Sequence, residues 1–178
     1  MSTVNIHDKR FEIFIPAEKI QLQIRRIADA INTDYAGKKP LFIAILNGSF
    51  MFASDLFKEL QMDAEICFVK LASYQGVKST GKVVTSIGLD VSLRERDIII
   101  LEDIVDTGKT LSDFIPQLAV QNPSSIKVAT LLHKPDALKF PLELHYICFE
   151  VENKFLLGYG LDYDGLGRNL PDIYQIME

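Results

Sequence analysis

The sequence predicts an α/β protein with a central, mainly parallel sheet. Short apolar runs of strand length alternate along the chain with segments of helical periodicity. Two of these runs, at residues 41–46 and 97–101, are apolar at nearly every position, which is typical of parallel strands buried on both faces. No repeat, low-complexity tract or Pro/Ser-rich linker divides the 178 residues, so we expect one domain spanning 1–178.

The first expected helix spans residues 17–33. Pro16 precedes it, at a position where proline is favoured. Isoleucine recurs within the segment at steps of four, three and four, as expected for one buried helix face: Ile20, Ile24, Ile27 and Ile31.

Eight further elements follow in the order strand, helix, strand, strand, strand, helix, strand, strand. They are expected at residues 41–46, 51–60, 65–73, 83–87, 97–101, 107–120, 126–132 and 146–151. A polar, glycine-bearing loop is expected at 75–82. Ligands of such sheets bind beyond the carboxyl ends of the strands, which directs attention to residues 47–49, 102–110 and 133–134.

The charge balance limits the partners that this chain can bind. It carries 19 lysine and arginine residues against 24 aspartate and glutamate residues, a formal net charge of −5. Nucleic acid and anionic membranes both attract a broad basic face, so neither is expected as a partner. No signal peptide is recognised and no run of about 18 apolar residues could span a bilayer, so a cytoplasmic protein is expected.

Cysteine and histidine show no pattern of a disulfide framework or a zinc site. Cys67 and Cys148 each lie in an apolar run and are expected to be buried. His7, His133 and His145 lack the spacing of a metal site or a nucleophilic triad, so we expect structural or surface roles for them.

The segment at residues 98–110 carries the most chemical information. Its apolar part ends at Glu102 and Asp103, whose carboxylates suit a hydrated cation or sugar hydroxyls. Asp106 and then Thr107-Gly108-Lys109-Thr110 lead into a helix, where backbone N–H groups and hydroxyls suit a phosphate. The GKT ending matches a P-loop, but that motif needs a glycine where this chain has Asp103, so we exclude a P-loop nucleotidase. An ordinary acidic loop that caps a helix is the simpler alternative.

Residues 101–110 resemble the phosphoribosyl-pyrophosphate (PRPP) binding motif of type I phosphoribosyltransferases. Three other segments match this family in order, so the resemblance runs from about Phe42 to the C-terminus: residues 46–50, Ser73-Tyr74 and residues 154–163. The last segment, with Lys134 before it and Arg168 after it, is similar to the 6-oxopurine branch, the hypoxanthine-guanine phosphoribosyltransferases. The resemblance implies the type I phosphoribosyltransferase fold: a mainly parallel sheet flanked by helices, with a small hood from the terminal segments.

The resemblance also implies a reaction and a set of residue roles. Members transfer the 5-phosphoribosyl group from PRPP to purine N9, releasing pyrophosphate and giving IMP or GMP in purine salvage, with Mg²⁺ as cofactor. Asp106 is the implied general base beside purine N7. The remaining implied roles are PRPP and 5-phosphate binding by Glu102, Asp103, Asp106, Thr107, Gly108, Lys109 and Thr110; pyrophosphate binding by Asn47, Gly48 and Arg168; purine binding by Lys134, Phe155, Leu156 and Asp162; and metal binding by Glu102, Asp103 and Asp162.

Two loops differ in how fully they match the family. Residues 73–82, beginning with Ser73 and Tyr74, resemble its mobile lid, whose closure would exclude water. Many members carry lysine where this chain has Asn47, so backbone N–H groups are expected to bind the pyrophosphate here. The implied partners are PRPP and a 6-oxopurine base, and the implied assembly is a homodimer or homotetramer.

Three alternatives compete with this interpretation. A xanthine-preferring enzyme stays open, because few side chains are expected at the 2-position of the base. A regulatory protein that kept the PRPP site but binds RNA or protein would need a different surface, and the net charge of −5 gives no sign of a basic face. An orotate- or adenine-type transferase is disfavoured, because the C-terminal segment matches the 6-oxopurine branch.

Overall fold

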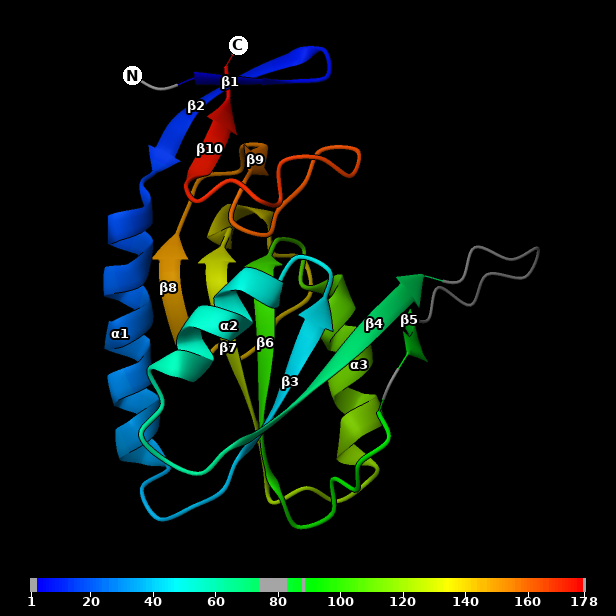
Figure 1. Cartoon of the computed structure of the whole chain (residues 1–178). Helices are drawn as coiled ribbons and strands as arrows, with labels where there is room; N and C mark the ends of the chain where they lie inside the picture. Colours follow the sequence, from blue (N-terminus) through cyan, green and yellow to red (C-terminus); the bar gives the residue numbers. More distant parts are fainter. Residues whose placement is uncertain (1–2, 74–82, 88, 178) are drawn as a thin grey trace, which may run out of the picture.

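A six-stranded sheet forms the centre of the computed structural model, which describes residues 3–73, 83–87 and 89–177 (Figure 1). Its strand order is β5-β4-β3-β6-β7-β8. The strands are β3 (Leu41–Leu46), β4 (Glu65–Ser73), β5 (Val83–Ile87), β6 (Asp97–Val105), β7 (Ser125–His133) and β8 (Tyr146–Glu150). All neighbouring pairs from β4 to β8 are parallel, and β5 joins the edge antiparallel to β4. The predicted α/β class, with a mainly parallel sheet, is confirmed.

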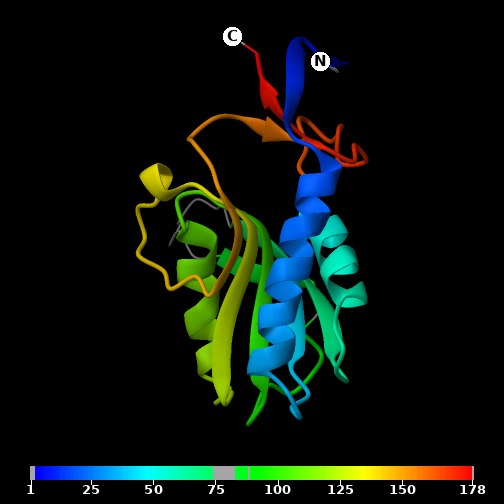
Figure 2. The same cartoon turned by 90° about the vertical axis from the view of Figure 1, so that its left-hand side faces the viewer.

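Helices cover both faces of this sheet, as the side view in Figure 2 shows. Helix α1 (Ala17–Asp34) packs against α2 (Phe50–Lys58) and β8 on one face, and α3 (Lys109–Ala119) covers the other. A single 3₁₀ turn, η1 (Pro135–Ala137), follows β7. Among the described residues, no helix is both long and apolar enough to cross a membrane.

The two ends of the chain meet in a second, antiparallel sheet above the carboxyl ends of the central strands (Figures 1 and 2). Its order is β1-β2-β10-β9, formed by β1 (Thr3–Ile6), β2 (Lys9–Ile15), β10 (Ile173–Ile176) and β9 (Leu156–Leu157). Phe11, Leu157 and Tyr174 form its own small core. The hood implied by the family resemblance is therefore present, although the hydrophobic periodicity of the sequence predicts none of its strands.

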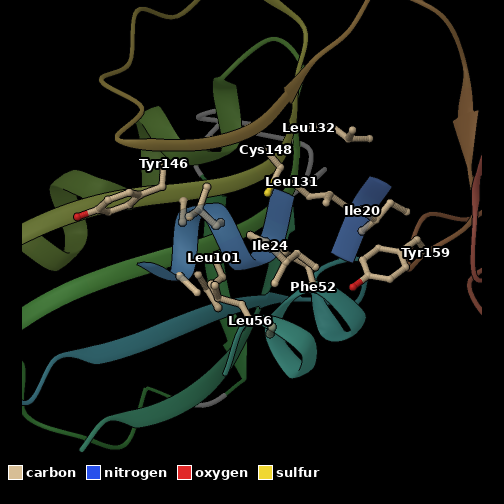
Figure 3. Close-up of a cluster of buried hydrophobic side chains, with 14 of the residues drawn as sticks. Ile20, Ile24, Phe52, Leu56, Leu101, Leu131, Leu132, Tyr146, Cys148 and Tyr159 are labelled. Carbon is tan, nitrogen blue, oxygen red and sulfur yellow. The ribbon is translucent and has the colours of Figure 1, made fainter. Parts of the chain in front are cut away.

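The central strands contribute side chains to two separate hydrophobic cores, one on each face of the sheet. In β3, Phe42 and Ala44 belong to the core under α1 and α2, whereas Leu41 and Ile43 belong to the core under α3. All four side chains are fully buried, which confirms the expectation from the continuous apolar run. Figure 3 shows part of the first core, in which Ile24 of α1, Phe52 of α2 and Leu101 of β6 meet.

Truncating a core isoleucine of α1 should destabilise the protein far more than truncating its exposed neighbour. Ile24 is 0% exposed and Leu22 is 57% exposed on the same helix. We expect Ile24→Ala to lower the free energy of unfolding by about 2–5 kcal/mol through lost burial and a cavity. Leu22→Ala should change it by about 0.5 kcal/mol or less. Urea denaturation of both variants measures the difference, and equal losses would contradict the assignment of the buried face.

Several expected boundaries differ from those in the structure. The ladder between β6 and β7 continues through Glu102 to Val105, so Glu102 and Asp103 lie inside the strand rather than beyond it. Backbone hydrogen bonds of a ladder do not depend on side-chain polarity, and the apolar run marks only the core part of this strand. Helix α3 begins at Lys109 rather than at residue 107, because Gly108 has a left-handed φ of +81°.

The prediction for the cysteines is confirmed for one of the two. Cys148 is buried in the core under α1, whereas Cys67 on β4 is only half-buried. Both are free thiols. Burial raises the pKa of the Cys148 thiol to about 12, which keeps it protonated and unreactive at neutral pH.

Candidate active site

Three neighbouring strands of the central sheet bring the candidate residues to one edge. Strands β3, β6 and β7 are adjacent and parallel, and their carboxyl ends point toward the hood (Figure 1). Residues 47–49, 102–110 and 133–134 therefore gather beneath it, as the strand pattern predicts.

The turn between β6 and α3 encloses a cavity of about 80 Å³, lined by Glu102 and residues 104–111. The carbonyl of Thr107 accepts hydrogen bonds from the backbone N–H groups of Lys139 and Phe140, each at 3.0 Å. A Cβ on Gly108 would lie 2.7 Å from the carbonyl oxygen of Phe140, so only glycine fits this position. The loop is thus pinned to the segment after β7, with the N-terminus of α3 beside the cavity.

The side chain of Lys109 is directed along α3. Its Nζ lies 2.7 Å from both carboxylate oxygens of Asp113 and 5.2 Å from the ring centre of Phe140. Its backbone N–H contacts Thr107 Oγ1 at 3.3 Å. Lys109 is one of the residues expected to bind the 5-phosphate. In the structure its backbone N–H faces the turn, whereas its ammonium group is paired with Asp113.

Glu102 and Asp103 place two carboxylates side by side at the edge of the site. Glu102 is 7% exposed, and burial together with the charge of Asp103 holds the pKa of its carboxyl well above the ordinary value. The backbone N–H of Asp103 donates to Glu102 Oε1 at 3.3 Å, and that of Ile104 donates to Asp103 Oδ1 at 2.9 Å. In the part of the chain that the structure describes, no basic side chain forms an ion pair with either carboxylate.

This carboxylate pair fits a magnesium ion that is shared with a substrate. Mg²⁺ commonly takes one or two protein carboxylates and completes its shell with substrate phosphates and water. The described residues hold no group of three or more His, Cys, Asp or Glu side chains placed around one ion. Asp162, the third expected metal ligand, is instead engaged with Arg168, so the pair at the end of β6 is the better-supported ligand set.

The loop after β3 lies directly against Asp103. Gly48 is buried, and a Cβ there would sit 1.5 Å from Asp103 Oδ2. Asn47 is exposed, and the peptide bond between Leu46 and Asn47 is cis. Ser49 closes the turn, with its hydroxyl donating to the carbonyl of Ile45 at 2.6 Å.

Asp106 and Lys134 face each other across the ends of β6 and β7. Lys134 Nζ lies 3.5 Å from Asp106 Oδ2. Lysines after strands are usually solvated, but Lys134 is only 6% exposed, and its backbone N–H donates to the carbonyl of Val105 at 2.9 Å. The Asp106 carboxylate is half-exposed and borders the phosphate-sized cavity, so it adjoins both a buried cation and that cavity.

The segment after β8 contributes the expected base-binding residues. The Phe155 side chain is 44% exposed, and its ring lies 5.6 Å from the ring of Tyr163. Leu156 is buried in β9 and pairs with Gln175 of β10. An exposed aromatic face held by hood strands suits stacking on a flat base.

Arg168 and Asp162 form an ion pair across the C-terminal loop. Arg168 Nη2 lies 2.7 Å from Asp162 Oδ1, and Arg168 Nη1 donates to the carbonyl of Gly160 at 2.7 Å. Asp162 Oδ2 accepts from the N–H of Gly165 at 2.8 Å. The two side chains therefore hold the loop in shape in the structure.

The expected lid is only partly described. Ser73 ends β4, where its backbone pairs with Val83 of β5. Tyr74 and the rest of the loop to residue 82 lie outside the described residues.

Sequence reasoning missed the residues that join the distant parts of the site. Gly160 has a φ of +100°, and a Cβ there would lie 2.0 Å from the carbonyl oxygen of Gly48. The C-terminal segment thus rests on the loop after β3. The glycines on either side of Tyr159 were a visible signal of unusual backbone, but nothing in the sequence indicates what they contact.

Comparison with known proteins agrees with this geometry. A model of the phosphoribosyl transferase domain family matches residues 15–164. A hypoxanthine-guanine phosphoribosyltransferase of Streptococcus thermophilus (strain CNRZ 1066) is 36% identical over 168 residues, which cover 94% of this chain and 93% of that protein.

Solved structures show the same relationship. A hypoxanthine phosphoribosyltransferase from Staphylococcus aureus has a TM-score of 0.88 at 36% identity, covering 93% of this chain and 91% of the other. A hypoxanthine-guanine phosphoribosyltransferase from Bacillus anthracis, with a HEPES molecule in the active site, has a TM-score of 0.88 at 34% identity and covers 93% and 98%. Because the family match spans most of the chain and such relatives align over nearly their whole length, this chain belongs to the phosphoribosyltransferase family.

Proposed function

We propose that this protein transfers the 5-phosphoribosyl group from PRPP to N9 of hypoxanthine or guanine, forming IMP or GMP and pyrophosphate in purine salvage. The observation that carries the proposal is the position of Asp106 between the buried ammonium of Lys134 and the cavity of the β6–α3 turn. That arrangement offers one proton acceptor between a group that can select a base and a loop that suits a phosphate. The names of the similar proteins point to the same reaction.

Different residues of the chain bind the 5-phosphate, bind the pyrophosphate and accept the proton. Backbone N–H groups and hydroxyls of residues 107–110 bind the 5-phosphate, and the loop of Asn47 and Gly48, with Arg168, binds the pyrophosphate. Asp106 takes the proton from purine N7 as N9 attacks the ribose carbon and pyrophosphate leaves. The ribose gains oxocarbenium character, so groups that hold the departing pyrophosphate stabilise the transition state more than the ground state.

Mg²⁺ is part of this proposal. Glu102 and Asp103 would hold the ion, and Asp162 is a candidate ligand for a second ion. When bound, the metal neutralises charge on the pyrophosphate oxygens. The burial of Glu102 beside another carboxylate supports a cation at this position, because two adjacent carboxylates in a buried site repel each other.

We assign recognition of the purine base to residues on the side of the site that faces the hood. Lys134 would donate to the exocyclic O6, Phe155 would stack on the ring, and the backbone of Leu156 would meet its edge. A donor at O6 favours 6-oxopurines over adenine, whose 6-amino group is itself a donor. A xanthine-preferring enzyme is the second candidate, and a regulatory PRPP-binding protein has no support from the relatives.

One assay tests the proposal and the metal together. Purified protein should convert hypoxanthine and guanine with PRPP and Mg²⁺ into IMP and GMP, followed by absorbance or chromatography. Adenine should react at least about 100-fold more slowly, because a site built around one polar partner rejects a base that leaves it unpaired. Excess EDTA should abolish turnover and added Mg²⁺ should restore it. Preferred turnover of xanthine would contradict the base assignment, and EDTA-resistant turnover would contradict the metal assignment.

We further propose a single domain over residues 1–178, a cytoplasmic location and a homodimer or homotetramer. The family match over residues 15–164 supports the domain assignment. Light scattering of the purified protein would measure the assembly, and a monomer at micromolar concentration would contradict it.

A further inference from the structure

Asp55 on α2 collects three hydrogen-bond donors from three parts of the chain. Its Oδ2 accepts from the Tyr159 hydroxyl at 2.5 Å and from Gln21 Nε2 of α1 at 2.6 Å. Its Oδ1 lies 2.6 Å from Lys58 Nζ on the same helix. None of the roles assigned above uses this cluster.

Asp55 and Tyr159 are largely shielded from water, whereas the Lys58 side chain is 68% exposed. Tyr159 is 2% exposed, and the Asp55 side chain is 18% exposed. Burial alone would raise the pKa of the Asp55 carboxyl, but hydrogen bonds from Lys58, Tyr159 and Gln21 outweigh it and the net pKa is lowered. Burial and the bond to Asp55 both raise the pKa of the Tyr159 hydroxyl, so the pair is a carboxylate and a neutral phenol at neutral pH.

Asp55 and Tyr159 join the segment proposed to bind the purine base to the segment proposed to bind the pyrophosphate. Helix α2, which contains Asp55, follows directly from the loop of Asn47 and Gly48. Tyr159 lies in the segment that runs from the exposed ring of Phe155 toward Arg168. Figure 3 shows the Tyr159 ring beside Phe52, with its hydroxyl turned toward α2.

The backbone around Tyr159 makes this attachment specific. Gly158, Tyr159 and Gly160 have φ values of +96°, +47° and +100°, and the middle one is rare for a residue with a side chain. The same turn puts Gly160 in contact with the carbonyl of Gly48. A left-handed tyrosine is tolerated when the surrounding contacts compensate for it, and here the side chain is bound at Asp55.

We propose that Asp55 and Tyr159 are positioning residues that hold the base-binding segment against the pyrophosphate loop. Through this bond, the segment that stacks on the base and the loop that binds the pyrophosphate keep the shapes that their ligands bind, so the pair supports ligand binding without taking part in the chemical step. The inference rests on the proposed phosphoribosyl transfer, and it assigns the pair no contact with substrate.

Tyr159→Phe tests the pair by removing one oxygen atom, and the chain offers a matched control. Tyr146 is 6% exposed and donates to the Asp34 carboxylate at 2.5 Å, but it lies at the other end of the core (Figure 3). We expect both Tyr159→Phe and Tyr146→Phe to lower Tm to a similar extent. Only Tyr159→Phe should raise the KM for the base in the forward reaction and for pyrophosphate in the reverse reaction, by about tenfold, with kcat within about threefold of wild type.

Each other outcome overturns the inference. Unchanged KM values in Tyr159→Phe, or equal KM shifts in both variants, would show a purely structural role. If Tyr159→Phe does not fold, Asp55→Asn takes its place, because a neutral amide weakens the same bond, and KM values equal to wild type would then overturn the inference. Wild-type protein without turnover of any purine would instead contradict the proposed function, and the inference would fall with it.

Discussion

Asp106→Asn should lower kcat by about 100- to 10,000-fold while leaving PRPP binding nearly unchanged. A general base contributes a rate factor of this size, and asparagine has the same shape without a basic oxygen. The carboxylate is half-exposed beside the cavity of the β6–α3 turn, so its replacement should not disturb the core. Single-turnover kinetics give the chemical step, and calorimetric titration gives the dissociation constant of PRPP.

Asp106→Asn also changes the surroundings of Lys134, and a double variant controls for this effect. Within the described residues, Asp106 is the carboxylate that pairs with the buried Lys134 ammonium, so Asp106→Asn also leaves that charge unpartnered. The double variant Asp106→Asn/Lys134→Met removes both groups. If loss of proton transfer causes the defect, the double variant stays as slow as Asp106→Asn. Equal losses in kcat and in PRPP binding would mean that Asp106 only positions substrate.

Gly160→Ala should lower kcat/KM by about 100-fold or more. The new Cβ would come within 2.0 Å of the Gly48 carbonyl oxygen, which is far inside van der Waals contact with main chain. The pyrophosphate loop or the base-binding segment must therefore move, and a displacement of about 1 Å in a site is enough for a loss of this size. Steady-state kinetics with PRPP and hypoxanthine measure the effect.

Gly37→Ala separates displacement from backbone strain. Gly37 also has a positive φ, +74°, but a Cβ there meets no atom within 4 Å. Each substitution introduces left-handed strain of about 1–2 kcal/mol, and Gly160→Ala adds the clash with the Gly48 carbonyl, so Gly160→Ala should lose more stability than Gly37→Ala. Normal activity in Gly37→Ala and strongly reduced activity in Gly160→Ala are expected. If both variants keep normal activity, the contact between Gly160 and Gly48 has no part in catalysis.

The central sheet was predictable because its strands are buried on both faces. A strand in that position must be apolar at nearly every residue, and the bounds of β3 at Leu41–Leu46 agree with the apolar run. The end of β6 was not predictable in this way. Its last four residues include Glu102 and Asp103. They are held in the strand by backbone hydrogen bonds to β7, which the sequence does not reveal because these side chains are not apolar.

The candidate residues at the strand ends were predictable, but the contacts between distant segments were not. A single sequence shows that Gly48 and Gly160 are glycines, yet it holds no information that places their main chains in contact. The same is true of Asp55 and Tyr159, which are separated by most of the chain. Lys134 was assigned only through the family resemblance, and its burial opposite Asp106 is a property of the folded sheet.

The hood has a consequence for how the enzyme is made. Strand β2 pairs with β10, with Phe11 opposite Ile176, so β2 cannot complete its pairing until β10 has left the ribosome. The segment that rests on Gly48 also belongs to this late-arriving region. The central sheet can form first, but the core under α1 and α2 includes Ile173 of β10, so this core and the site are completed only after β10 has been synthesised. Nascent chains should therefore have a folded central sheet yet remain inactive until β10 has docked.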